Sequence, residues 1–319
     1  APLLARFGKV VLPAPGGDSI GERLLYTHFE LLSHLGIKVE GEHGSYELSG
    51  TAQPKQIFLD EASVTATEMG LILASTVPGT TVIEDAAGEP HVQDLARFLA
   101  NSGANITGAG TNTLTIEGTK GLRGIEHSVV NDYIEVGTFV IATAITGGET
   151  KIIGAQERDL KIILSYLSQM GVEFSLEGEV LEVRKSELVA RRRQFKTRPW
   201  PGFPTDLMSA FIVLATQTKG TVLCHDWMFE WRIFFVDHLI KMGADITIAD
   251  PHRIIVSGKR ELHGEIIPSN DIRAGSALVL AALAARGESI IEHAEIIDRG
   301  FENLGGRLSA LGAKIERLE

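Results

Sequence analysis

Residues 274–285 read AGSALVLAALAA, and this stretch decides the fold. As a helix it is apolar around nearly its whole circumference, and such a helix must be buried on all sides. Residues 137–145, GTFVIATAI, have the same character. Strands alternate instead: within residues 111–117, Leu114 and Ile116 share one face and polar residues hold the other. The sequence therefore predicts small-residue helices inside and sheets facing solvent.

Internal repetition extends this pattern along the chain. At regular places a hydrophobic helix ends in a glycine and an alternating strand follows, at Gly36, Gly103, Gly171, Gly243 and Gly312. These glycines lie roughly 70 residues apart, and glycine tolerates the left-handed conformation that stops a helix. A second set ends the small-residue helices and precedes β-rich runs, at Gly79, Gly148, Gly220 and Gly287. Each period thus holds two helices and several strands, which predicts a repeated βαβαββ module.

Length and repetition together predict the domain organisation. The chain has 319 residues, 44% of them hydrophobic, which is enough for two domains. We expect an α/β protein, a two-domain inside-out α/β barrel of repeated βαβαββ units with helices buried and sheets outside. The expected domains are residues 1–130 and 131–319. Because the chain begins at Ala1 without an initiator Met and partway through a repeat, we expect the first domain to be incomplete at its start.

Composition excludes several classes of protein. A net charge of -11 and a sequence pI near 5.4 leave no basic face for nucleic acid, so an anionic substrate must be held by a few focused arginines and lysines. The single cysteine, Cys224, lies in an apolar run and reads as a buried strand thiol in a reducing cytoplasm. No apolar run reaches the length of a membrane helix, and the histidines lack metal-ligand spacing. We expect no membrane insertion, no metal and no cofactor.

The first candidate for chemistry is the glycine turn in residues 13–23, PAPGGDSIGER. Asp18 lies at its tip, and Arg23 can offer a two-pronged guanidinium to a phosphate. An acid on a mobile turn beside an anion clamp suits proton transfer to a phosphorylated substrate. An ordinary Pro-Gly turn with a solvated Asp is the competing interpretation.

Two further segments carry charged residues at helix starts. In residues 200–206, WPGFPTD, Asp206 is either the N-cap of the next helix or a general base aimed by a rigid loop. Arg273 and Arg299 also stand at or near helix starts, where a cation opposes the helix dipole. That position favours a ligand role, with a structural ion pair as the alternative.

Taken together, four segments resemble the UDP-N-acetylglucosamine 1-carboxyvinyltransferase family of enolpyruvyl transferases, and the resemblance covers essentially the whole chain. They are residues 15–21 (PGGDSIG), 84–90 (EDAAGEP), 203–206 (FPTD) and 297–301 (IDRGF). The family fold has two domains of three βαβαββ units with the helices inside. About one and a half of these units, at the start, have no counterpart in this chain.

The resemblance implies roles for individual residues. Asp18 matches the lid acid, where most members carry Cys, and Asp206 matches the catalytic aspartate near the sugar 3-hydroxyl. The arginines matching those around phosphoenolpyruvate and phosphate are Arg23, Arg232, Arg273 and Arg299. The residues matching nucleotide-sugar or other cleft contacts are Arg23, His28, Ser63, Val64, Glu89, Asp132, Met228 and Glu230. Three departures from the family pattern are Glu61, Tyr133 and Trp231.

The resemblance implies transfer of enolpyruvate from phosphoenolpyruvate to the 3-hydroxyl of UDP-N-acetylglucosamine, at the first committed step of peptidoglycan synthesis in the cytoplasm. One alternative is a catalytically impaired fragment or a divergent non-catalytic relative of the same fold. A relative of RNA-terminal-phosphate cyclases is another, although the acidic charge argues against it. An incomplete first domain would leave apolar surfaces and strand edges uncovered, so self-association is also expected.

Overall fold

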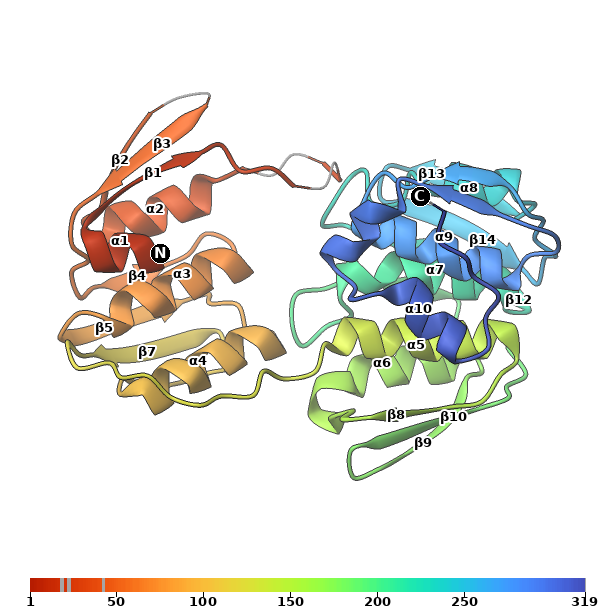
Figure 1. Ribbon diagram of the computed structural model, residues 1–319, viewed down its shortest axis with the longest axis horizontal. Coiled ribbons are helices and arrows are strands. Elements are labelled where there is room, and N and C mark those ends of the chain that lie inside the picture. Colours follow the sequence, from red (N-terminus) through yellow and green to blue (C-terminus); the bar gives the residue numbers. More distant parts are fainter. Residues whose placement is uncertain (18–19, 22–23, 42–43, 319) are drawn as a thin grey trace. The chain divides into compact units, whose positions relative to one another are not determined.

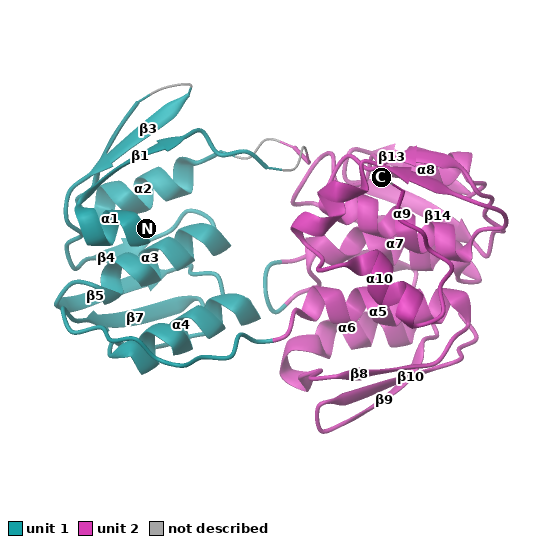
Figure 2. Ribbon diagram, viewed as in Figure 1, with its two compact units in different colours: residues 1–17, 23–130, 199–201 teal, residues 18–22, 131–198, 202–319 magenta. Residues whose placement is uncertain are grey.

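The computed structural model describes residues 1–17, 20–21, 24–41 and 44–318, and the chain forms two compact units. Unit 1 comprises residues 1–17, 23–130 and 199–201, and unit 2 comprises residues 18–22, 131–198 and 202–319 (Figure 2). Within the described residues, no helix is long and apolar enough to cross a membrane.

Unit 1 contains two sheets and four helices in its described part. Its helices are α1 (Pro2–Phe7), α2 (Tyr26–His34), α3 (Val64–Ser75) and α4 (Pro90–Ser102). Its strands are β1 (Lys9–Pro13), β2 (Lys38–Glu40), β3 (Ser45–Ser49), β4 (Gln56–Phe58), β5 (Gly79–Glu84), β6 (Asn105–Thr107) and β7 (Thr113–Gly118). The sheet orders are β1-β3-β2 and β4-β5-β7-β6, and only the β4–β5 pair is parallel.

Unit 2 repeats this plan and extends it. Its helices are α5 (Tyr133–Thr146), α6 (Glu157–Gln169), α7 (Met208–Gln217), α8 (Val236–Lys241), α9 (Ile272–Ala284) and α10 (Leu304–Ala310), with 3-10 turns η1 (Thr205–Leu207) and η2 (Ala294–Arg299). Its first strands are β8 (Thr150–Ile153), β9 (Glu173–Glu177), β10 (Val180–Arg184), β11 (Gln194–Lys196) and β12 (Gly220–His225). The remaining strands are β13 (Ile246–Asp250), β14 (Arg253–Gly258), β15 (Ile266–Pro268) and β16 (Ile290–Glu292).

The predicted βαβαββ module is confirmed in both units. The segment β4-α3-β5-α4-β6-β7 in unit 1 and the segment β11-α7-β12-α8-β13-β14 in unit 2 have the same element order. Their four-stranded sheets also have the same strand order, β4-β5-β7-β6 and β11-β12-β14-β13. In each sheet the first two strands are parallel, because the first helix carries the chain from one to the other.

Three helices form the centre of unit 2. Helices α5, α7 and α9 pack against one another, and every residue of α7 is buried. Figure 1 shows them between the sheet of β8, β9 and β10 and the sheet that contains β12, β13 and β14. The prediction of buried small-residue helices is confirmed for residues 137–144 and for most of residues 274–281; the last turn of α9 is half-buried.

The second helix of a module is different from the first. Helices α4 and α6 bury only one face, and polar residues cover the other. The prediction that helices lie inside therefore holds for the first helix of each complete module and not for these second helices. The sheets show the expected alternation: Leu114 and Ile116 of β7 are fully buried, and their neighbours are not.

The first set of glycines behaves as predicted, and the second set does not. All five glycines of the first set have positive φ, between 81° at Gly36 and 126° at Gly103. In the second set, Gly147, with φ of 66°, caps α5 in place of Gly148, and helices α3, α7 and α9 end before Gly79, Gly220 and Gly287, so the prediction that this set ends the helices is wrong. Cys224 is the expected buried thiol in β12, where burial raises its pKa to about 12.

Candidate active site

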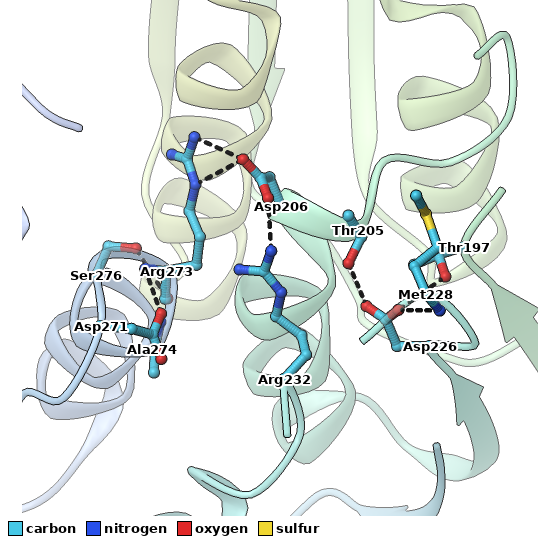
Figure 3. Close-up of polar contacts among 10 residues, drawn as sticks. All are labelled: Thr197, Thr205, Asp206, Asp226, Met228, Arg232, Asp271, Arg273, Ala274 and Ser276. Atoms are coloured by element: carbon cyan, nitrogen blue, oxygen red, sulfur yellow. Dashed lines mark hydrogen bonds and ion pairs between the residues drawn. The ribbon is translucent and has the colours of Figure 1, made fainter. Parts of the chain in front are cut away.

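The carboxylate of Asp206 lies between two arginines in unit 2. Its Oδ1 accepts a hydrogen bond from Nη2 of Arg232 at 2.8 Å. Its Oδ2 accepts from Nε and Nη2 of Arg273 at 3.1 and 2.9 Å (Figure 3). Asp206 lies in η1, and the N-cap of α7 is Leu207, so the N-cap interpretation of Asp206 is wrong. Its carboxylate is aimed at cations.

The arginines set the charge state of this carboxylate. Burial tends to raise the pKa of Asp206, but attraction and hydrogen bonds from Arg273 and Arg232 outweigh it, so the pKa lies below its ordinary value. The Arg232 side chain is only 3% exposed and that of Arg273 is 16% exposed. Asp206 is therefore ionised at neutral pH and accepts protons weakly while both arginines bind it.

Each of the two guanidinium groups has one N–H donor that no described residue binds. Nε of Arg232 and Nη1 of Arg273 are buried and have no hydrogen-bond partner among the described residues. The guanidinium carbons lie over the rings of Phe229 and Phe301, at 5.3 and 5.5 Å from the ring centroids. Because a buried donor without a partner is costly, these N–H groups are suited to bind an anionic ligand.

Local structure fixes the start of α9, where Arg273 lies. Oδ1 of Asp271 accepts hydrogen bonds from the backbone N–H groups of Arg273 and Ala274, both at 2.8 Å. Asp271 is thus the N-cap of α9, and Arg273 occupies the second position of the helix. This cap sets the direction in which the Arg273 side chain leaves the helix.

A second buried carboxylate, Asp226, lies beside this cluster, and sequence reasoning missed it. It accepts hydrogen bonds from the hydroxyls of Thr197 and Thr205 and from the backbone N–H of Met228. Burial raises its pKa, against the effect of these bonds and of Arg232. The available signal was its place directly after the apolar strand β12, where a carboxylate at a strand end needs partners.

The remaining candidates of unit 2 lie on other segments than Asp206. Met228 is half-buried and contacts Asp226 through its backbone. Asp132 is the N-cap of α5, where its Oδ1 accepts from the N–H groups of Ile134 and Glu135. Arg299, at the end of η2, and Glu230 are both exposed.

The candidates in unit 1 lie in α2, at the start of α3 and just before α4. The His28 ring contacts the Thr65 hydroxyl at 2.7 Å, its Nδ1 is buried without a partner among the described residues, and burial lowers its pKa. Ser63 is the N-cap of α3, which begins at Val64. Oε2 of Glu89 is likewise buried without a described partner, and burial raises the pKa of Glu89.

Two candidates lie outside the described residues. These are Asp18 and Arg23, so the structure gives no geometry for the predicted lid acid or for its anion clamp. Among the residues that are described, no group of three or more His, Cys, Asp and Glu side chains is arranged to hold a metal ion.

Comparison with known proteins identifies the family. The sequence profile described as EPSP synthase (3-phosphoshikimate 1-carboxyvinyltransferase) matches residues 1–308. A UDP-N-acetylglucosamine 1-carboxyvinyltransferase of Treponema denticola is 49% identical over 100% of this chain and 76% of its own length. The chain belongs to the UDP-N-acetylglucosamine 1-carboxyvinyltransferase family. A member from Bradyrhizobium diazoefficiens is 45% identical over 99% of this chain and 75% of its own length.

Solved structures agree on the fold of this carboxyvinyltransferase family. The enolpyruvyl transferase NikO of Streptomyces tendae matches with a TM-score of 0.86 at 23% identity, over 98% of this chain and 75% of that one. An EPSP synthase of Acinetobacter baumannii matches with a TM-score of 0.72 at 21% identity, over 99% and 77%. At these identities the likeness concerns the fold alone, and it confirms the predicted α/β architecture.

Proposed function

We propose that this chain transfers enolpyruvate from phosphoenolpyruvate to the 3-hydroxyl of UDP-N-acetylglucosamine and releases phosphate. Membership of the carboxyvinyltransferase family supports the reaction. The structural observation that carries the proposal is the pair Arg232 and Arg273, which both bind Asp206. Each of the two arginines also has a buried N–H donor without a partner among the described residues. Such a pair fits the phosphate and carboxylate of phosphoenolpyruvate next to a carboxylate that can take up a proton.

The reaction needs a base, an acid and an anion site. The sugar hydroxyl adds to C2 of phosphoenolpyruvate and loses its proton, while C3 takes up a proton, which gives a tetrahedral adduct. The bond from C2 to the phosphate oxygen then breaks and C3 gives up a proton. Inorganic phosphate leaves and the enolpyruvyl ether remains, so atoms and charge balance without a redox step.

Asp206 is our choice for the base, and its pairing suggests how its basicity is controlled. While Arg232 and Arg273 both bind it, the carboxylate is a weak base. An arriving phosphate or carboxylate competes for the same N–H groups. When it draws one arginine away, the attraction that lowers the Asp206 pKa decreases, so the carboxylate becomes a stronger base once substrate is bound. Phosphoenolpyruvate binding and proton acceptance are then linked.

We assign the acid to Asp18 and the remaining candidates to substrate contacts. A solvated Asp is largely ionised near pH 7, so Asp18 must be desolvated before it can donate a proton to C3. Arg23 and Arg299 would add positive charge for the departing phosphate. The residues proposed to contact the nucleotide sugar or to line the cleft are His28, Ser63, Val64, Glu89, Asp132, Met228 and Glu230. Residues 1–130 and 131–319 are proposed as the two enolpyruvyl transferase domains.

The setting follows from the substrates. We propose that the product enters peptidoglycan synthesis, and thereby cell-wall growth, cell shape and division. Nucleotide sugars and phosphoenolpyruvate are intracellular metabolites, so the reaction is proposed for the cytoplasm.

Phosphate release measured with each substrate omitted in turn tests the proposal. Release should require both phosphoenolpyruvate and UDP-N-acetylglucosamine, and mass spectrometry should find the enolpyruvyl ether. Shikimate 3-phosphate is the matched alternative acceptor, since the family profile is described by that reaction. With phosphoenolpyruvate present, release with shikimate 3-phosphate but not with UDP-N-acetylglucosamine would assign the 3-phosphoshikimate 1-carboxyvinyltransferase activity. No release with either acceptor would favour a non-catalytic relative.

A further inference from the structure

Asp226 is fully buried, and it joins its own segment of unit 2 to the earlier segment that contains Thr197 and Thr205. It follows β12 directly, and its side chain is 0% exposed. Its Oδ1 accepts from the Thr197 hydroxyl at 3.2 Å and from the Met228 N–H at 3.1 Å, and its Oδ2 accepts from the Thr205 hydroxyl at 2.5 Å (Figure 3). Thr197 follows β11, Thr205 begins η1, and Met228 leads towards Arg232.

The backbone of Asp226 is fixed as well. Its N–H donates to the His252 carbonyl at 2.9 Å, and a ring nitrogen of His252 contacts its carbonyl oxygen at 2.8 Å. Trp227 strengthens the same junction, because its Nε1–H donates to the Thr197 carbonyl at 2.9 Å. The carboxylate therefore projects from a rigid point at the end of the sheet, and the segments that bind it take their position from that point.

The bond to Thr205 has a direct consequence for Asp206. Thr205 and Asp206 are neighbours in η1, so a hydroxyl held at 2.5 Å leaves the Asp206 backbone little freedom. Arg232 follows Met228 in the chain, so the same carboxylate binds the segments that lead to both partners of the Asp206–Arg232 ion pair.

We propose that Asp226 is a positioning residue, which acts through Thr205 to hold the Asp206 carboxylate in register with Arg232 and Arg273. The expected change in kcat rests on the proposed function. The expected position of the Asp206 carboxylate does not, because it follows from hydrogen bonds within this chain.

Two matched variants test it. Thr205→Val and Thr197→Val each remove one hydroxyl donor from the same buried carboxylate, but only Thr205 adjoins Asp206. We expect similar losses of thermal stability from both. We expect kcat to fall about 10-fold or more in Thr205→Val alone, because a displacement of roughly 1 Å can cost 100-fold. KM for UDP-N-acetylglucosamine should change less than about 3-fold, and Thr205→Ser, which keeps the hydroxyl, should restore kcat.

Crystal structures of the two variants provide a second readout that does not require activity. The Asp206 carboxylate should lose its contact with at least one arginine in Thr205→Val and keep both contacts in Thr197→Val. Unchanged contacts in Thr205→Val would overturn the proposal, as would an equal fall of kcat in the two valine variants. If the wild-type chain transfers no enolpyruvate, the proposed function fails, and the structures still decide the role of Asp226.

Discussion

Arg273 donates two hydrogen bonds to a single oxygen of Asp206, from Nε at 3.1 Å and from Nη2 at 2.9 Å. These two residues are 67 positions apart in the sequence and belong to different βαβαββ modules. Their contact leaves Nη1 of Arg273 buried and unused among the described groups. The cation site is therefore assembled before a substrate arrives, and an anion needs only to add to it or exchange with Asp206.

Replacement of this carboxylate should reduce both activity and stability. Asp206→Asn keeps the shape but removes the charge between two largely buried arginines, so they are left without a counter-ion. Turnover should fall about 100-fold or more if Asp206 is the base. The Tm should fall by about 3 °C or more, the shift that roughly 1 kcal/mol produces in a unit of this size.

The pH dependence of that stability loss has a definite sign. The folded-state pKa of Asp206 is below its ordinary value of 3.8, so its stabilising effect is present above pH 3.8 and is lost as the pH falls through the folded-state pKa. The Tm difference between wild type and Asp206→Asn should thus be equal at pH 7 and pH 5. Asp250→Asn, which opens the more exposed ion pair with Arg253, is the control and should change activity little. A difference that disappears already at pH 5 would contradict this account.

Arg273 should be sensitive even to a change that preserves its charge. Arg273→Lys keeps the charge but removes the planar fork, in which Nε and Nη2 bind Asp206 while Nη1 remains available to an anion. We expect KM for phosphoenolpyruvate to rise about 10-fold, as for the loss of one charge-assisted hydrogen bond. Initial-rate kinetics measure this effect. Arg253→Lys makes the same replacement at an exposed pair on β14 and should leave KM unchanged; equal effects of the two would count against an anion site at Arg273.

The architecture could be predicted because single residues fix it locally. Gly36 and Gly103 stop helices for a reason that lies in one residue, the absence of a Cβ at positive φ. The burial of α5 and α9 follows from their own composition. The exposed faces of α4 and α6 differ from the prediction of buried helices, because that prediction rests on the composition of the small-residue helices, which α4 and α6 do not share. The amphipathic pattern of α6, with Leu160, Ile163 and Leu167 buried, was the available signal.

The site could be predicted only in part, because it depends on long-range pairing. Asp206 and its two arginines were chosen from their loops and from the family resemblance, but nothing in the sequence shows that they touch. Asp226 was missed because a carboxylate after a strand is common, and only the approach of Thr205 makes it distinctive. The N-cap interpretation of Asp206 failed because arginines from two other segments bind its side chain.

Glu89 gives a prediction for unit 1. Burial raises its folded-state pKa above the ordinary 4.5, so folding favours the protonated carboxyl, and the benefit is lost as the pH rises through the folded-state pKa. Glu89→Gln is uncharged throughout and should therefore raise the Tm at pH 7.5 but not at pH 4. Glu117→Gln, on the exposed side of β7, is the control. Thermal unfolding at the two pH values measures the effect, and a Tm for Glu89→Gln below wild type at pH 7.5 would oppose it.

Exposed apolar side chains in unit 1 predict self-association of residues 1–319. Phe7 of α1 is 66% exposed and Val11 of β1 is 58% exposed. β1 is an edge strand, bound on one side by β3. Exposed apolar edges favour association. Light scattering should show concentration-dependent oligomers, and the double variant Phe7→Glu/Val11→Lys should reduce them. Ile255→Glu, at an exposed position on β14, which is paired on both sides by other strands of unit 2, should not. A monomer at all concentrations would refute the prediction.

Asp18 gives a prediction about a covalent inhibitor. Fosfomycin alkylates the lid cysteine in members of the carboxyvinyltransferase family that carry one, since a thiolate is a strong nucleophile. Asp18 offers a carboxylate, a much weaker nucleophile towards an epoxide, so the wild-type chain should escape alkylation. Asp18→Cys should become sensitive while it keeps some turnover, because both side chains can deliver a proton. Asp18→Asn cannot act as the acid and should lose most product formation. Mass spectrometry after fosfomycin treatment, with product assays of each variant, tests both statements. An adduct on wild-type Asp18 would contradict the first statement, and full turnover of Asp18→Asn would show that another residue is the lid acid.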